Sequence, residues 1–153
     1  MFHPSEIHPD VELRNYLKDK ISVVVSGSTT KKVTVYGDWE RPTNGLEDDF
    51  IVIMLNGDFG GVGMDTPFVR GFLMVSLYCR LNDDGSVKKK RVEKILKQFD
   101  TLVDNKSTDH YFFKYDPQQF ITPTTPNITS GYSVTTLNLR WTTNSNFNKP
   151  VTP

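Results

Sequence analysis

The chain of 153 residues contains a single cysteine, Cys79, and has no excess of charge of either sign. One cysteine excludes an internal disulfide and argues against the stapled scaffolds of small secreted domains. The 18 basic and 18 acidic residues cancel, so no overall field would hold a phosphate backbone or an anionic membrane. We therefore expect neither membrane association nor direct nucleic-acid recognition, and we expect Cys79 to be a small core residue.

Long apolar segments are also missing. No apolar run approaches the length of a membrane span, and the opening MFHPSEIHPD lacks the basic and apolar regions of a signal peptide. The length lies near the most common domain size and is sufficient for one core. We expect one soluble domain over residues 1–153, with its core at about 10–143 and a frayed tail at 144–153.

Motifs for catalysis or cofactor binding are absent as well. The glycine-rich GDFGGVG at 57–63 lacks the Lys-Ser/Thr pair of a P-loop and precedes a predicted strand rather than a helix. His3, His8, Asp10 and His110 could be imagined as metal ligands, but the first three lie on a terminus without supporting groups, which favours coincidence. No serine or cysteine nucleophile has a visible general base beside it. The sequence therefore predicts a protein that is not an enzyme and holds no cofactor or metal.

Two charged runs are best explained by solvation. Glu47, Asp48 and Asp49 could bind a cation, but three consecutive carboxylates before an apolar strand usually form a solvated loop. The basic run 88–91 stands at the start of a predicted helix, where cations oppose the helix dipole. We expect both runs to face solvent.

The regular elements follow from hydrophobic periodicity. A three- and four-residue apolar spacing predicts a helix at 10–21, and a second, clearer stripe predicts a helix from about Val92 to Val103, with its N-cap supplied by the segment 83–86. Segment 26–32 is polar and turn-rich. Apolar alternation or short apolar runs predict strands at 33–39, 50–55, 69–81, 110–115 and 132–143. The fold class expected from this order is α+β, a mostly antiparallel sheet with two helices packed on one face.

The second face of that sheet carries an unusual mixture of side chains. Successive strand residues point to opposite sides, so the apolar side of 69–81 suits burial under the helices. The other side is rich in aromatic residues, Met and Arg, the composition of protein interface cores, and should be covered by a partner. The residues expected at a subunit interface are Arg70, Phe72, Met74, Tyr78, Arg80, Tyr132 and Arg140.

An intramolecular explanation of this face remains open. A long loop could fold across it, or the sheet could curl and partly close on itself. The glycine-rich segment between the strands at 50–55 and 69–81 is expected to be an adaptable loop that docks onto a neighbour. The residues expected in this partner-contact loop are Gly57, Phe59, Gly60, Gly61 and Gly63.

The order of elements resembles the tail-terminator, or tail-completion, proteins of long-tailed bacteriophages and prophages. The resemblance covers about residues 10–143. The resemblance rests on the order, the size and the apolar patterning of six segments. These segments are VELRNYLKDKI, VYGDWERP, IVIML, FVRGFLMVSLYCRL, VEKILKQFDTLV and YSVTTLNLRW.

The resemblance implies a homo-oligomeric ring, commonly of six copies, at the head-proximal end of the tail tube. Such a ring stops tube polymerisation and offers a surface to head-completion or connector proteins. It implies as partners the tail tube protein and a head-completion or connector protein, and as locations the virion tail and, during assembly, the host cytoplasm. It implies no catalytic residues.

Two other functions stay open. The chain could be another small phage head-tail connector, head-completion or minor capsid protein, which would share the composition and the assembly role. It could also be a small-ligand-binding α+β domain in which the second sheet face lines a cavity.

Overall fold

The computed structural model describes residues 8–26, 29–37, 49–61, 69–115, 125–127 and 131–143, and it has the predicted α+β class. The helices are α1 (Pro9–Leu17) and α2 (Lys89–Val103). The strands are β1 (Ser22–Ser26), β2 (Thr29–Lys32), β3 (Thr34–Gly37), β4 (Phe50–Gly61), β5 (Val69–Arg80), β6 (Lys106–Ser107), β7 (Tyr111–Tyr115), β8 (Thr125–Asn127) and β9 (Tyr132–Thr143).

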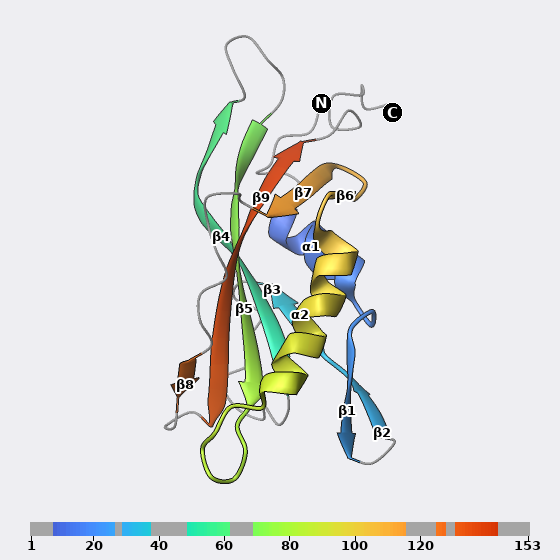
Figure 1. Ribbon diagram of the computed structural model, residues 1–153. Coiled ribbons are helices and arrows are strands. Elements are labelled where there is room, and N and C mark those ends of the chain that lie inside the picture. Colours follow the sequence, from blue (N-terminus) through green and yellow to red (C-terminus); the bar gives the residue numbers. More distant parts are fainter. Residues whose placement is uncertain are drawn as a thin grey trace.

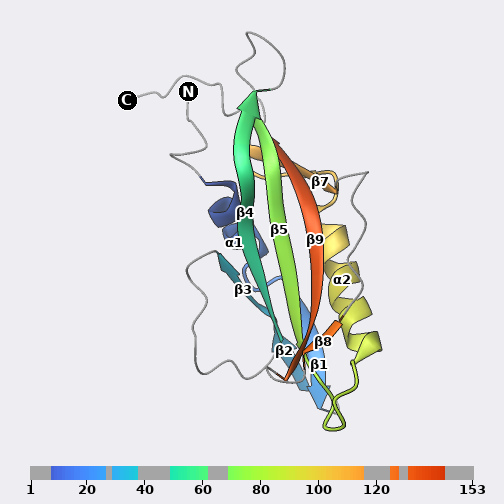
Figure 2. The ribbon, with the colours of Figure 1, turned by 90° about the vertical axis from the view of Figure 1, so that its left-hand side faces the viewer.

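A seven-stranded sheet organises the molecule. Its order is β3-β4-β5-β9-β7-β6, and β8 pairs with the end of β9. The pairs are antiparallel except for β3 and β4, which run parallel. The three long strands β4, β5 and β9 lie side by side (Figures 1 and 2), so they form the frame on which the other elements are placed.

Both helices cover the same face of the sheet (Figures 1 and 2). The core between helices and sheet is one cluster that draws apolar residues from α1, α2 and the inward side of the three long strands. The inward residues predicted on β5 and β9, from Leu73 to Cys79 and from Leu137 to Trp141, are buried in this cluster. The predicted packing of two helices on one face is what the structure has.

Helix α1 is shorter than predicted. Pro9 stands in its first turn and Asp10 and Glu12 supply acidic groups there, both of which favour a helix start. The helix ends at Leu17, because Asp19 adopts a left-handed conformation with φ of 62° that a helix cannot continue through. Ile21 is nevertheless fully buried, so its periodic position reflects the core and not the helix.

Helix α2 confirms the predicted stripe but not the predicted cap. Its buried residues are Val92, Ile95, Phe99 and Val103. Its N-cap is Lys88, without a side-chain hydrogen bond. The Asp84 carboxylate accepts instead from the Ser86 backbone N–H, at 2.9 Å, so the segment 83–86 closes its own turn rather than the helix.

The polar segment after β1 was predicted as turn-rich, yet Thr29–Lys32 forms strand β2. Backbone pairing with β1 holds it, while all its side chains are exposed, so no apolar pattern marks it. The hairpin is anchored to α2 by Gln98, which accepts a hydrogen bond from the Ser22 N–H at 3.1 Å and donates one to the Ser22 carbonyl at 2.8 Å.

None of the helices in the described ranges is long and apolar enough to cross a membrane.

We predict that Gly71→Ala destabilises the protein by about 1 to 3 kcal/mol. A Cβ at this buried strand position would lie 2.6 Å from Cζ2 of Trp141, which is itself fully buried. Urea unfolding measures the change. The penalty should shrink in a Trp141→Leu background, where the clashing ring is gone, and equal penalties in both backgrounds would contradict the contact.

We also predict that Cys79 is alkylated only through unfolding. The thiol is fully buried, and burial, followed by the charge of Asp49, raises its pKa from 9.0 to about 12. Iodoacetamide at pH 8 should therefore label the native chain only in proportion to its unfolded fraction, so that urea accelerates labelling, as measured by mass spectrometry. Rapid native labelling at pH 8 would contradict this.

The same shift predicts a dependence of stability on pH. Between about pH 9 and 12 only the unfolded thiol ionises, so this group lowers stability as pH rises. Cys79→Ala should remove that part of the pH dependence, measured by urea unfolding across this range.

Candidate assembly surface

The three long strands present one face that neither helix covers (Figure 2). The strand register places residues of this face directly opposite one another, with Phe72 beside Asn56 and Arg140, and Tyr78 beside Phe50 and Val134. On β5 and β9 no position of this face carries Asp or Glu. The face divides into two parts with different exposure.

One part, here called the aromatic cluster, is a small second core. Phe50 is 2% and Tyr132 5% exposed, and they are joined by Val52 and by the partly buried Tyr36, Met54 and Tyr78. Phe50 stacks on Tyr78 with ring centroids 4.7 Å apart and meets Tyr132 edge-on at 5.4 Å. Such aromatic pairs add about 0.5 to 1.5 kcal/mol beyond burial, so this end of the sheet is held together within one copy of the chain.

The other part, here called the open patch, consists of Arg70, Phe72, Met74, Asn138 and Arg140. Phe72 is 38% exposed and Arg70 is exposed, whereas Met74, Asn138 and Arg140 are partly buried. The Arg140 guanidinium lies 6.0 Å from the centre of the Phe72 ring, close enough for a cation–π contact. This patch offers an exposed aromatic ring flanked by cations.

The structure therefore separates the residues predicted at a subunit interface. Arg70, Phe72, Met74 and Arg140 lie together in the open patch. Tyr132 is buried within a single chain, so placing it at an interface was wrong, because it has almost no surface left to offer a second copy. Tyr78 is half-buried in the aromatic cluster, and Arg80, though exposed, donates to the Tyr132 hydroxyl at 3.2 Å. For this end of the face the intramolecular alternative holds.

Sequence reasoning missed the contribution of β4 to this face. Phe50, Val52 and Met54 alternate with Ile51 and Ile53, which belong to the main core. The signal was the nearly continuous apolar run itself, since a strand that is apolar on both sides is usually covered on both sides.

Most of the residues predicted in the partner-contact loop belong to a strand. Gly57, Phe59, Gly60 and Gly61 belong to the backbone of β4, and Gly63 lies outside the described residues. Pairing with β5 shifts between Asn56 and Gly60, a bulge of the kind that glycine accommodates in strands. The glycines thus extend a strand with an irregular register, and the prediction of a loop there was wrong.

The prediction that Asp49 lies in a solvated loop was wrong. It is buried, accepts a hydrogen bond from the Arg80 backbone N–H at 2.8 Å, and lies 3.6 Å from Nη1 of Arg91. Arg91, from the basic run predicted to face solvent, also reaches the Val24 carbonyl at 3.4 Å. The pair joins the start of β4 to the start of α2 and has a structural role.

Within the described residues, a cluster of polar side chains surrounds Glu12. Its carboxylate lies 2.5 Å from Nδ1 of His110 and accepts hydrogen bonds from the His110 backbone N–H, at 3.1 Å, and from the Thr108 hydroxyl. The Thr108 hydroxyl and the His110 backbone N–H both donate to this one carboxylate, which holds the three residues together. The arrangement fastens α1 to the turn before β7.

The imagined metal ligands are not gathered in the part of the chain that the structure describes. Nδ1 of His8 lies 4.0 Å from Asp10, His110 pairs with Glu12, and His3 is outside the described residues. Within the described ranges no group of three or more His, Cys, Asp or Glu side chains could hold a metal ion.

Comparison with known proteins adds no family to this geometry. No protein-family model matches the sequence, and no curated protein matches it.

We predict that Asp49→Ala costs about 2 to 4 kcal/mol, because it leaves the Arg80 N–H without its acceptor and the half-buried Arg91 without its carboxylate partner. The exposed Asp83 provides the matched control, and Asp83→Ala should change stability by less than about 0.5 kcal/mol. Guanidinium unfolding of both variants checks this. Equal effects would show that the buried pair contributes nothing.

Proposed function

We propose that this chain is a structural assembly protein that forms a closed homo-oligomeric ring and acts as a tail terminator of a long-tailed phage. In this role the ring caps the head-proximal end of the tail tube, stops tube polymerisation and receives the head-completion or connector protein. The observation that carries the proposal is the open patch on the helix-free face of the long strands.

The composition of the open patch supports a contact with protein. An exposed Phe beside Met and two Arg, without Asp or Glu on the same face of β5 and β9, matches the enrichment of aromatic residues, Met and Arg in interface cores. The partner surface that fits it is apolar at its centre, with carboxylates placed toward Arg70 and Arg140. Charge of that kind would set orientation more than affinity.

Rigidity supports the same use of this face. The open patch stands on strands β5 and β9, which are paired from Arg70 to Arg80 and from Tyr132 to Thr142. The aromatic cluster and the main core fix these strands from both sides. A surface held in this way loses little conformational freedom on binding, which favours a defined angle between neighbours.

Ring closure follows if the open patch meets a different surface of the next copy. Contacts of this heterologous type generate a closed ring when the rotation between neighbours divides a full turn. A ring of this kind has two unlike sides, so one side can bind the tail tube while the other binds a head protein.

We predict that the purified protein forms an oligomer several times heavier than the 17.5 kDa protomer, and that Phe72→Asp weakens its self-association about tenfold or more. Light scattering over a concentration series measures both. Val24→Asp is the matched control, since Val24 is 53% exposed and lies on the β1–β2 hairpin, outside the open patch. The control should keep the mass of the unsubstituted protein.

Two outcomes would contradict the proposal. One is a chain that stays monomeric at every concentration and salt tested, and the other is a Phe72→Asp variant that assembles normally. Negative-stain electron microscopy adds a separate check of shape, because a compact dimer in place of a ring with a central opening would exclude the terminator role while retaining self-association.

A further inference from the structure

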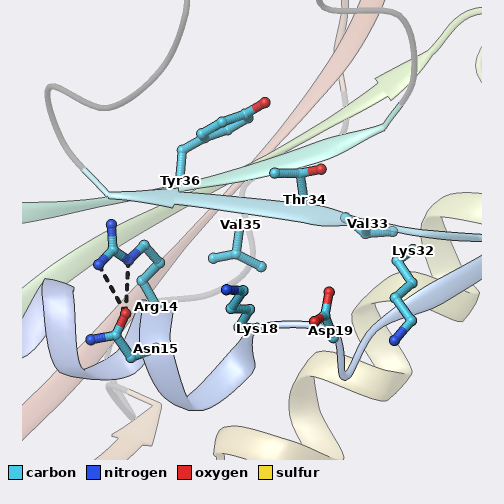
Figure 3. A pocket seen from close by; sticks show the side chains of 9 residues that line it. All are labelled: Arg14, Asn15, Lys18, Asp19, Lys32, Val33, Thr34, Val35 and Tyr36. Atoms are coloured by element: carbon cyan, nitrogen blue, oxygen red, sulfur yellow. Dashed lines mark hydrogen bonds between the residues drawn. The ribbon is translucent and has the colours of Figure 1, made fainter.

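A cationic cleft lies between α1 and β3, on the side of the sheet that carries the helices (Figure 3). Its volume is about 390 Å³, within the range of pockets that hold small ligands. Arg14, Lys18 and Lys32 line it against a single carboxylate, that of Asp19. The remaining lining residues are Asn15, Val33, Thr34, Val35 and Tyr36.

The side chains from the helix are directed into this cleft. Figure 3 shows Arg14 and Lys18 rising from α1 toward β3, with Val35 pointing down between strand and helix. Arg14 donates two hydrogen bonds to Oδ1 of Asn15, from Nη2 at 2.8 Å and from Nε at 3.2 Å. These bonds orient the guanidinium before any ligand arrives.

The position of Lys32 points to a ligand rather than to helix stability. Arg14 and Lys18 stand at the C-terminal end of α1, where cations are favoured by the helix dipole. Lys32 comes from β2 and has no such reason to be there. Within the described residues neither Lys18 nor Lys32 has a carboxylate within ion-pair distance, although both line a concave surface.

The shape of the cleft favours an extended peptide over a bare inorganic ion. One wall is the continuous run Lys32–Tyr36, which includes β3 at the edge of the sheet. Val33 is tied to the Ile21 carbonyl at 2.8 Å, and from Thr34 onward β4 is the only strand that pairs with β3 in the described part of the chain. An edge strand with apolar and cationic side chains nearby suits a segment that lies along it and presents acidic side chains.

We propose that this cleft binds an extended acidic segment of a partner protein, whose carboxylates pair with Lys18 and Lys32 while its backbone follows β3. A bare phosphate ion fits less well, because the cleft of about 390 Å³ has room for about a dozen waters, more space than one such ion fills. The site lies on the opposite side of the sheet from the open patch and does not depend on ring formation.

The test uses a fluorescently labelled peptide of alternating glutamate and valine, with a glutamine–valine peptide of equal length as its neutral match. Fluorescence anisotropy should show saturable binding of the acidic peptide only. Lys18→Gln/Lys32→Gln should weaken that binding about tenfold or more, since charge-assisted contacts are lost. Lys89→Gln/Lys106→Gln removes the same charge from exposed positions outside the cleft and should leave affinity within about twofold.

Three results would overturn the proposal. The first is no saturable binding of the acidic peptide up to millimolar concentration. The second is equal weakening by both double variants, which would indicate diffuse electrostatic attraction. The third is complete displacement of the peptide by equimolar inorganic phosphate, which would assign the cleft to free anions.

Amide chemical shifts provide the readout of location. On addition of the acidic peptide, shifts should concentrate in residues 14–19 and 32–36. Shifts centred on Phe72 and Arg140 would place the peptide on the open patch and contradict the assignment of the cleft.

Thermal unfolding provides the control for folding. Lys18 and Lys32 are both exposed, so thermal unfolding of Lys18→Gln/Lys32→Gln should match that of the unsubstituted protein.

Discussion

Burial of one face of β4, β5 and β9 under α1 and α2 is the constraint on which the rest of the molecule depends. The core cluster contains the inward side of all three strands and the apolar stripes of both helices. Since apolar burial contributes about 25 cal/mol per Å², this layer supplies most of the stabilising free energy. It also fixes where the remaining side chains of these strands point. Successive residues of a strand point to opposite faces, so burial of one set under the helices places the other set on the opposite face.

Burial of one side of each strand explains why the surroundings of the second face could be predicted from the sequence only in part. The alternation along β5 and β9 assigned each residue to a face correctly, since the period of a strand is two. It could not say what covers the second face, because coverage depends on contacts between segments far apart in the chain. Phe50 stacks on Tyr78 and meets Tyr132 edge-on, and no local sequence pattern predicts contacts among these three residues. Four of the predicted interface residues are therefore found in the open patch, and Tyr132 is not.

Elements defined by backbone pairing or by polar contacts escaped prediction for a related reason. Strand β2 is made of exposed Thr and Lys residues and exists because β1 pairs with it. Asp49 stands among carboxylates that look solvated, yet it is buried against the Arg80 backbone and Arg91. In contrast, α2 and β5 were predicted almost to their ends, because each has a long and regular apolar pattern. The cationic cleft between α1 and β3 was not foreseen, since Arg14 and Lys32 approach each other only after the helix and the hairpin are in place.

The position of β9 has a consequence for the order in which the molecule can form. This last described strand lies in the interior of the sheet and pairs with β5, β7 and β8. During synthesis the chain must therefore hold β5 and β7 apart, each with an open edge, until residues 132–143 have left the ribosome. Closing such distant pairs is slow, and open edges attract other strands. The edges of β5 and β7 are thus exposed to wrong pairing from their own synthesis until that of β9, and pairing with β9 both completes the core and covers those edges.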